Sequence, residues 1–197
     1  LNNPYQPVCE CMTLSKKPSV TPQSDNKAGE IPDISSSQFC WKPAEEYTVA
    51  DCWKSWLHDP GSLTKALVLK SDNQFEVEVA DERWMTIESA KLRAEFGPIS
   101  PNQKFWSRKV ILRGRGIPWV MAHTLLPAHS LESPLREVME LESKPLGAYL
   151  FGHPELIRTG MDVTPFHEDS WGRRSLFFLF GKPVMVAEFF LPEILLD

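Results

Sequence analysis

Two charged residues lie on strand faces that are otherwise apolar, and their chemistry suits the recognition of a polar ligand. Alternate residues of a strand point to one face, so Arg108 and Glu188 each lie on an apolar face, in segments 104–112 and 184–191. Their same-face neighbours are Trp106, Val110 and Leu112 for the arginine, and Val184, Val186 and Phe190 for the glutamate. A buried charge without a partner is costly. Two interpretations remain open: the residues form a structural ion pair, or they hold a ligand between them.

Two β-hairpins must position these residues. The first joins segments 104–112 and 117–126 through Gly114-Arg115-Gly116, and the second joins 174–180 and 184–191 through Gly181-Lys182-Pro183. The other expected elements are helices over 49–57, from 62 onward and over 133–141, a strand over 75–87, a loop over 97–102, and a short apolar run over 146–151. Mostly antiparallel strands with a few helices predict an α+β fold.

The composition divides the chain into a polar arm and one domain. Residues 1–40 are rich in Pro, Ser, Asn, Gln and Lys, which predicts an N-terminal arm that is weakly structured or draped on the domain. Hydrophobic residues make up 42% of the 197-residue chain, so residues 41–197 suffice for a single domain with one packed core.

Charge and spacing argue against several classes of function. The net charge of -5, with no run of four Lys or Arg residues, disfavours a nucleic-acid partner. A helix that spans a membrane needs about 18 or more consecutive apolar residues, and the sequence has no such stretch. The five histidines and four cysteines lack metal-ligand spacing, so no metal is expected. A secretory apolar segment is missing from the start of the sequence, which favours a reducing, cytoplasmic location with free thiols. A monomer is the default expectation for the oligomeric state.

Arg173 and Arg174 form a second cationic pair, at the start of the expected second hairpin. They could form a second anion-binding clamp, or they could lie at a solvated strand edge and stabilise little. The strand pattern by itself leaves both interpretations open.

Three stretches of the sequence carry a resemblance to a known family. They are Trp171 to Ser175 (WGRRS) followed by Gly181 to Pro183 (GKP) and Glu188 to Pro192 (EFFLP); Lys144 to Phe151 (KPLGAYLF); and Arg108 through Pro118-Trp119 to Thr124 and Pro127. In this order they resemble the chorismate pyruvate-lyases of quinone biosynthesis. The resemblance implies an antiparallel β-sheet with helices packed around it, enclosing a small-ligand cavity.

The resemblance also implies roles for single residues. Arg108 matches the family arginine that grips the ligand carboxylate, and Glu188 matches the carboxylate near the ligand hydroxyl. Leu146 matches a residue whose backbone lines the pocket, and Leu63 falls where the family commonly has Met on a helix. At His123 this chain departs from a family arginine at the pocket entrance, so His123 is expected to act as a gate.

By this resemblance the chain is a chorismate lyase, a carbon–oxygen lyase that converts chorismate to 4-hydroxybenzoate and pyruvate without a cofactor, with slow departure of product. Arg108 and Glu188 would be its catalytic residues. The alternative function is a non-catalytic small-molecule-binding module, because effector domains of one class of bacterial transcription regulator share this fold. Such regulators carry an upstream DNA-binding helical domain, which residues 1–40 do not resemble.

Overall fold

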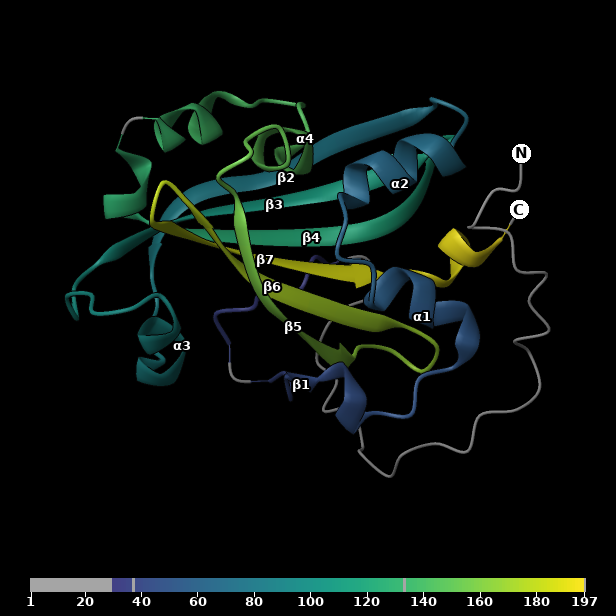
Figure 1. Cartoon of the computed structure of the whole chain (residues 1–197), viewed down its shortest axis with the longest axis horizontal. Helices are drawn as coiled ribbons and strands as arrows, with labels where there is room; N and C mark the ends of the chain where they lie inside the picture. Colours follow the sequence, from purple (N-terminus) through teal and green to yellow (C-terminus); the bar gives the residue numbers. More distant parts are fainter. Residues whose placement is uncertain (1–29, 37, 133, 197) are drawn as a thin grey trace.

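One seven-stranded antiparallel sheet organises the chain (Figure 1). The structure, a computed structural model, describes residues 30–36, 38–132 and 134–196. The strands are β1 (Lys42–Pro43), β2 (Phe75–Thr86), β3 (Lys104–Gly114), β4 (Ile117–Pro127), β5 (Ile157–Pro165), β6 (Trp171–Leu179) and β7 (Lys182–Phe190). Their order across the sheet is β1-β5-β6-β7-β4-β3-β2. The predicted α+β class is therefore confirmed. The greater part of the predicted arm, residues 1–29, lies outside the described residues.

Both predicted hairpins form, each closed by a two-residue turn. Arg115 and Gly116 connect β3 to β4 with φ values of 54° and 76°, and Phe180 and Gly181 connect β6 to β7 with 53° and 73°. Two successive positive φ values match the right-handed twist of the flanking strands. The second turn had been expected over Gly181-Lys182-Pro183, but Lys182 already pairs with Leu179 in the ladder.

Within the described residues, four α-helices pack against the sheet. They are α1 (Asp51–Leu57), α2 (Leu63–Lys70), α3 (Ala90–Glu95) and α4 (Leu146–Leu150), and short 3-10 turns cover Ala44–Glu46, Ala128–Leu131, Leu135–Glu140 and Pro192–Leu195. The predicted cap of α2 is confirmed, because the Ser62 hydroxyl accepts the Lys65 N–H at 3.4 Å. The helix expected over 133–141 is wrong in type, since the described part of that segment forms a 3-10 turn.

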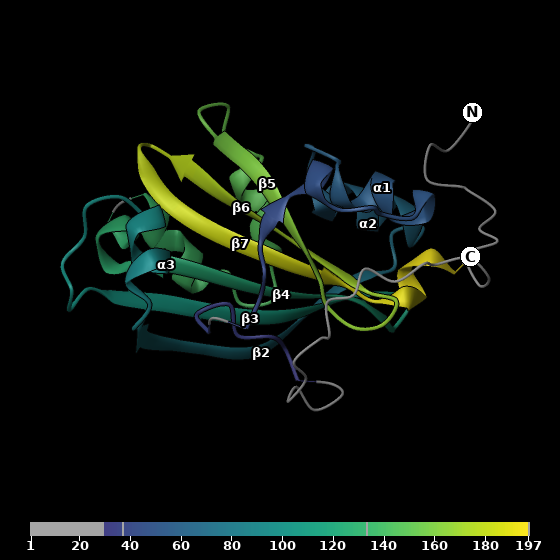
Figure 2. The same cartoon turned by 90° about the horizontal axis from the view of Figure 1, so that it is seen from below.

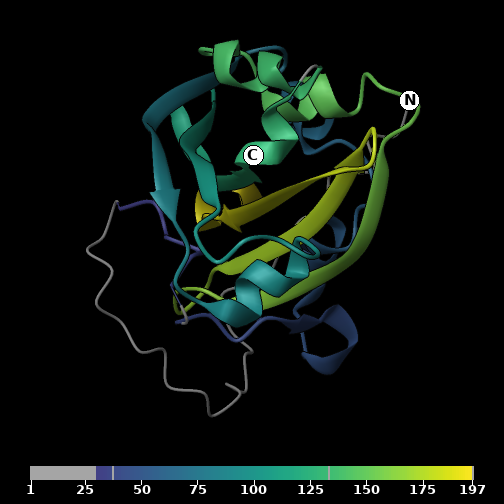
Figure 3. The same cartoon turned by 90° about the vertical axis from the view of Figure 1, so that its left-hand side faces the viewer.

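The helices cover the two faces of the sheet unequally. Helices α1, α2 and α4 lie on one face, and α3 lies on the other (Figures 1 and 2). Figure 3 shows the segment that carries α4 above the curved sheet and α3 on the opposite side. The described part of the expected arm also packs on the α3 face, where Ile31 and Ile34 are buried.

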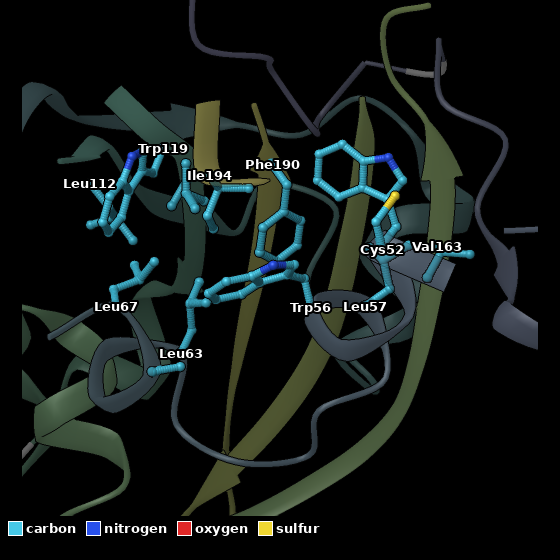
Figure 4. Close-up of a cluster of buried hydrophobic side chains, with 14 of the residues drawn as sticks. Cys52, Trp56, Leu57, Leu63, Leu67, Leu112, Trp119, Val163, Phe190 and Ile194 are labelled. Carbon is cyan, nitrogen blue, oxygen red and sulfur yellow. The ribbon is translucent and has the colours of Figure 1, made fainter. Parts of the chain in front are cut away.

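Under α1 and α2 the sheet carries a cluster of buried aromatic and aliphatic side chains (Figure 4). Trp56 packs on Phe190 with 6.2 Å between ring centroids, and Leu63 and Leu67 of α2 join the same cluster. This packing anchors both helices to the sheet beside the candidate site.

Further findings differ from the sequence-based expectations. Strands β1 and β5 and helix α3 were not predicted, and the expected free thiols hold for exposed Cys40 but not for Cys52, which is disulfide-bonded. Cys9 and Cys11 lie outside the described residues. No helix among the described residues is long and apolar enough to cross a membrane.

Candidate functional site

A pocket lies between the sheet and helices α2 and α4. Its empty volume is about 630 Å³, including the space that opens to solvent. The apolar lining residues are Leu63, Val77, Val110, Leu112, Ala122, Pro145, Leu146, Leu150, Phe151, Phe177 and Val186, together with Gly61 and Gly147. The charged side chains of the lining are three arginines and one carboxylate: Arg108, Arg158, Arg173 and Glu188. A largely apolar pocket with a few converging polar groups is typical of a small-ligand site.

Arg108 reaches this pocket from β3, on the face that the strand alternation predicted. Its side chain is 2% exposed. One terminal nitrogen donates to the carboxylate of Glu82, the directly paired residue of β2, and the other donates to the Glu142 carbonyl at 2.5 Å. These contacts hold the guanidinium in a fixed orientation at the pocket wall. Glu82, rather than Glu188, is therefore the ion-pair partner of Arg108.

Glu188 lines the same pocket from β7 and has its own partner. Arg173 Nε donates to Glu188 Oε2 at 2.6 Å, and Arg173 Nη1 donates to the carbonyls of Trp56 at 2.6 Å and Asp59 at 3.0 Å. The sequence analysis offered two interpretations, a direct Arg108–Glu188 ion pair or a ligand held between the two charges, and neither included a separate partner for each residue. In the structure each charge is balanced separately, and both side chains remain beside a shared cavity.

The arginine pair 173–174 divides between the two faces of the sheet. Arg173 lines the pocket, whereas Arg174 contacts Glu95 and Asp162 on the opposite face at 3.2 Å and 3.1 Å. Adjacent strand residues point to opposite faces, so only one of the two could join the site.

Arg158 enters the pocket from β5 and was missed by the sequence analysis. Its Nε donates to the Ser175 hydroxyl at 2.9 Å. Burial, together with the neighbouring Arg173 guanidinium, lowers the pKa of Arg158 to about 10. The apolar residues Ile157, Met161 and Val163 lie in one alternating phase and could have indicated a strand, but Thr159 interrupts that phase.

Leu63 and Leu146 both line the pocket, from the first residues of α2 and α4. The two helices approach closely at Gly147, where an added Cβ would lie 2.5 Å from the Thr64 Oγ1. The close approach of these helix starts forms the wall opposite the sheet.

His123 lies elsewhere, and this placement corrects the expected gate. Its ring is fully buried on the α3 face of β4, where Nδ1 accepts the Ile34 N–H at 3.1 Å and Nε2 lies 2.8 Å from the Ser107 hydroxyl. Burial lowers the pKa of His123 to about 3, so the ring is neutral. The pocket-lining residues of β4 are its neighbours Ala122 and Thr124. His123 is one position out of phase with them, and the period of two turns it away.

In the described part of the chain, no group of three or more His, Cys, Asp or Glu side chains is placed to hold a metal ion. The polar groups at this pocket are guanidiniums, a carboxylate and hydroxyls, which suit an organic anion that also carries a hydroxyl.

Comparisons with known proteins identify the family of this chain. The sequence model for the chorismate lyase family matches residues 35–196. The chain is 34% identical to the chorismate pyruvate-lyase of Yersinia enterocolitica over 152 residues, which cover 77% of this chain and 88% of that protein. It is 33% identical to the chorismate pyruvate-lyase of Serratia proteamaculans, covering 77% and 85%. The crystal structure of PhnF from Mycobacterium smegmatis shares the fold at 14% identity, with a TM-score of 0.50 over 68% of this chain and 65% of that one. The chain therefore belongs to the chorismate lyase family.

Proposed function

We propose that this chain converts chorismate to 4-hydroxybenzoate and pyruvate, with Arg108 and Glu188 as its catalytic residues. The observation that carries the proposal is the placement of these two side chains beside one apolar pocket, in a chain of the chorismate lyase family. Chorismate has a carboxylate at one end of its ring and a hydroxyl at the other, so its polar groups correspond to this pair.

The reaction balances without any added reagent. The carbon–oxygen bond of the enolpyruvyl ether breaks, and its electron pair leaves with the enolpyruvate oxygen. The proton on the ring carbon that bears the hydroxyl departs, and its C–H electron pair completes the aromatic ring. Protonation of the enolpyruvate gives pyruvate. The protein must hold one conformer of the substrate and stabilise the charge that moves.

Arg108 and Glu188 divide this task. The planar guanidinium of Arg108 can donate two parallel hydrogen bonds to the ring carboxylate, and its contacts with Glu82 and Glu142 hold it in place. The Glu188 carboxylate accepts a hydrogen bond from the ring hydroxyl, beside the carbon that loses its proton. Arg173, which donates to Glu188, positions that carboxylate.

The apolar wall completes the site. Leu63 and Leu146 contact the ring from the helix side, and Val110 and Val186 face it from the sheet. Exclusion of water by these side chains strengthens the charge contacts to the substrate. The proposal extends to a cytoplasmic monomer that feeds quinone biosynthesis.

The purified chain, incubated with chorismate and a metal chelator, tests the proposal. We expect 4-hydroxybenzoate absorbance to rise and pyruvate, measured with lactate dehydrogenase, to appear in equal amount. Single-turnover conditions are included so that slow product release does not hide the chemistry. Absence of both products under single-turnover conditions would overturn the proposal, and tight binding of another small molecule would then favour the non-catalytic module.

A further inference from the structure

Arg158 differs from the other two arginines of the pocket in its charge partners. Arg108 is paired with Glu82, and Arg173 is paired with Glu188. Among the described residues, no carboxylate lies within ion-pair distance of Arg158, and its hydrogen-bond acceptors are the Ser175 hydroxyl at 2.9 Å and the Asp59 carbonyl at 3.3 Å. The carboxylates of Glu188 and Asp59 lie near enough to favour the charged form of Arg158, but neither forms an ion pair with its guanidinium.

On balance, the surroundings of Arg158 disfavour its positive charge. The guanidinium lies over the Phe177 ring, 5.1 Å from its centroid, and Arg173 stands beside it. The pKa of Arg158 falls to about 10 because burial and then the charge of Arg173 disfavour its charged form. An anionic group bound next to Arg158 would offset both effects.

The order of the charged groups across the sheet indicates which anion this is. Arg108 lies on β3, Glu188 lies two strands away on β7, and Arg158 lies two strands further on β5. Neighbouring strands are about 4.8 Å apart, so the backbones of β3 and β7 are separated by about 10 Å, and those of β7 and β5 by about the same distance. Chorismate presents its groups in the same order: ring carboxylate, ring hydroxyl with the adjacent ether, and the carboxylate of the enolpyruvyl arm.

We propose that Arg158 binds the enolpyruvyl carboxylate of the substrate and holds that arm beside Glu188. This role rests on the proposed lyase function and deepens it. It makes Arg158 a residue that distinguishes substrate from product, because 4-hydroxybenzoate keeps the ring carboxylate and hydroxyl but lacks the third polar group. Release of pyruvate removes that contact, while Arg108 still holds the aromatic product.

The test compares Arg158→Met with the wild-type chain on two ligands. Methionine keeps an unbranched apolar stem and removes the charge. We expect the KM for chorismate to rise roughly 10- to 100-fold, the scale of a lost hydrogen bond to a charged group. The Kd for 4-hydroxybenzoate, measured by tryptophan fluorescence, should stay within about twofold of wild type. Arg158→Lys, which keeps a cation, should recover part of the loss.

Controls separate this role from a structural one. Arg174→Met removes a guanidinium from the next strand on the opposite face and should change neither constant. Equal weakening of chorismate and 4-hydroxybenzoate by Arg158→Met, or no change for either, would overturn the inference. Failure of the wild-type chain to form product would instead refute the proposed function, so the two failures are distinguishable.

Discussion

Glu188 and Arg173 face each other at directly paired positions of β7 and β6, with Arg173 Nε 2.6 Å from Glu188 Oε2. The same guanidinium also donates to the carbonyls of Trp56 and Asp59, at and just beyond the end of α1. One side chain thus fixes the proposed catalytic carboxylate and ties α1 to the sheet.

Substitution of Arg173 by Met should therefore destabilise the fold. The variant leaves the Glu188 carboxylate and two carbonyls without their donor, and breaking a buried pair in this way costs about 3–5 kcal/mol. The free energy of unfolding in urea measures the loss. Arg174→Met removes a side chain that is 13% exposed, against 1% for Arg173, and whose carboxylate partners are about one-third exposed, so it should lose about 1 kcal/mol or less. Equal losses in the two variants would contradict the assignment.

Glu188→Gln should reduce turnover more than binding. Glutamine keeps the shape of the side chain but removes the negative charge that faces the ring hydroxyl. We expect kcat to fall about 100-fold or more, as when a charge-matched contact to a transition state is lost. Single-turnover rates of 4-hydroxybenzoate formation report the effect. A variant with wild-type kcat would rule out a catalytic role for this carboxylate.

Arg108→Ala should weaken substrate and product together, because both carry the ring carboxylate. The expected loss in binding free energy is about 2–5 kcal/mol, the scale for truncating one partner of a buried charged contact. The KM for chorismate and the Kd for 4-hydroxybenzoate measure it. Lys109→Ala is the matched control, since Lys109 pairs with Asp33 on the opposite face at 3.2 Å. Unchanged product affinity in Arg108→Ala would be incompatible with the proposed contact.

Gly147→Ala should disturb the wall between α2 and α4. The added Cβ would lie 2.5 Å from the buried Thr64 Oγ1, so the Thr64 side chain must shift or the helix starts must separate. Overpacking of this kind costs about 1–3 kcal/mol in stability. Thermal unfolding and 4-hydroxybenzoate affinity should both fall, and Thr64→Ala in the same chain should restore them in part. No recovery in the double variant would place the defect elsewhere.

The buried His123 ring should make stability depend on pH. Its pKa is lowered from 6.5 to about 3, chiefly by burial, so the folded chain holds the neutral ring and the unfolded chain takes up a proton first. The stability contribution is complete above pH 6.5 and is lost as the pH falls toward 3. For one proton the loss is about 1.4 kcal/mol per pH unit within that window.

Urea unfolding of wild type and His123→Asn between pH 7 and 4.5 measures this contribution. Asparagine can still accept the Ile34 N–H but does not titrate, so its stability should fall less steeply. His129, whose pKa burial also lowers, remains in both chains and cancels in the comparison. Parallel pH profiles for the two chains would show that His123 is not the titrating group.

The sequence alone determined which face of each central strand meets the pocket, because side-chain direction follows from local alternation. Arg108 and Glu188 were found in this way, as single charges on apolar faces. The same rule could have excluded His123 as a gate, since it lies one residue out of phase with Ala122 and Thr124. The class of fold likewise followed from two hairpins and their turn residues.

Only the tertiary structure decided which charges are partners. Glu82 and Arg108 are 26 positions apart in the chain, and Arg173 and Glu188 are 15 apart, yet strand pairing puts each pair side by side. Arg158 joins the site because β5 pairs with β6, and the apolar alternation of its own segment is interrupted at Thr159. Pair energies depend on distance and burial, which strand register and helix packing set and which no local pattern contains.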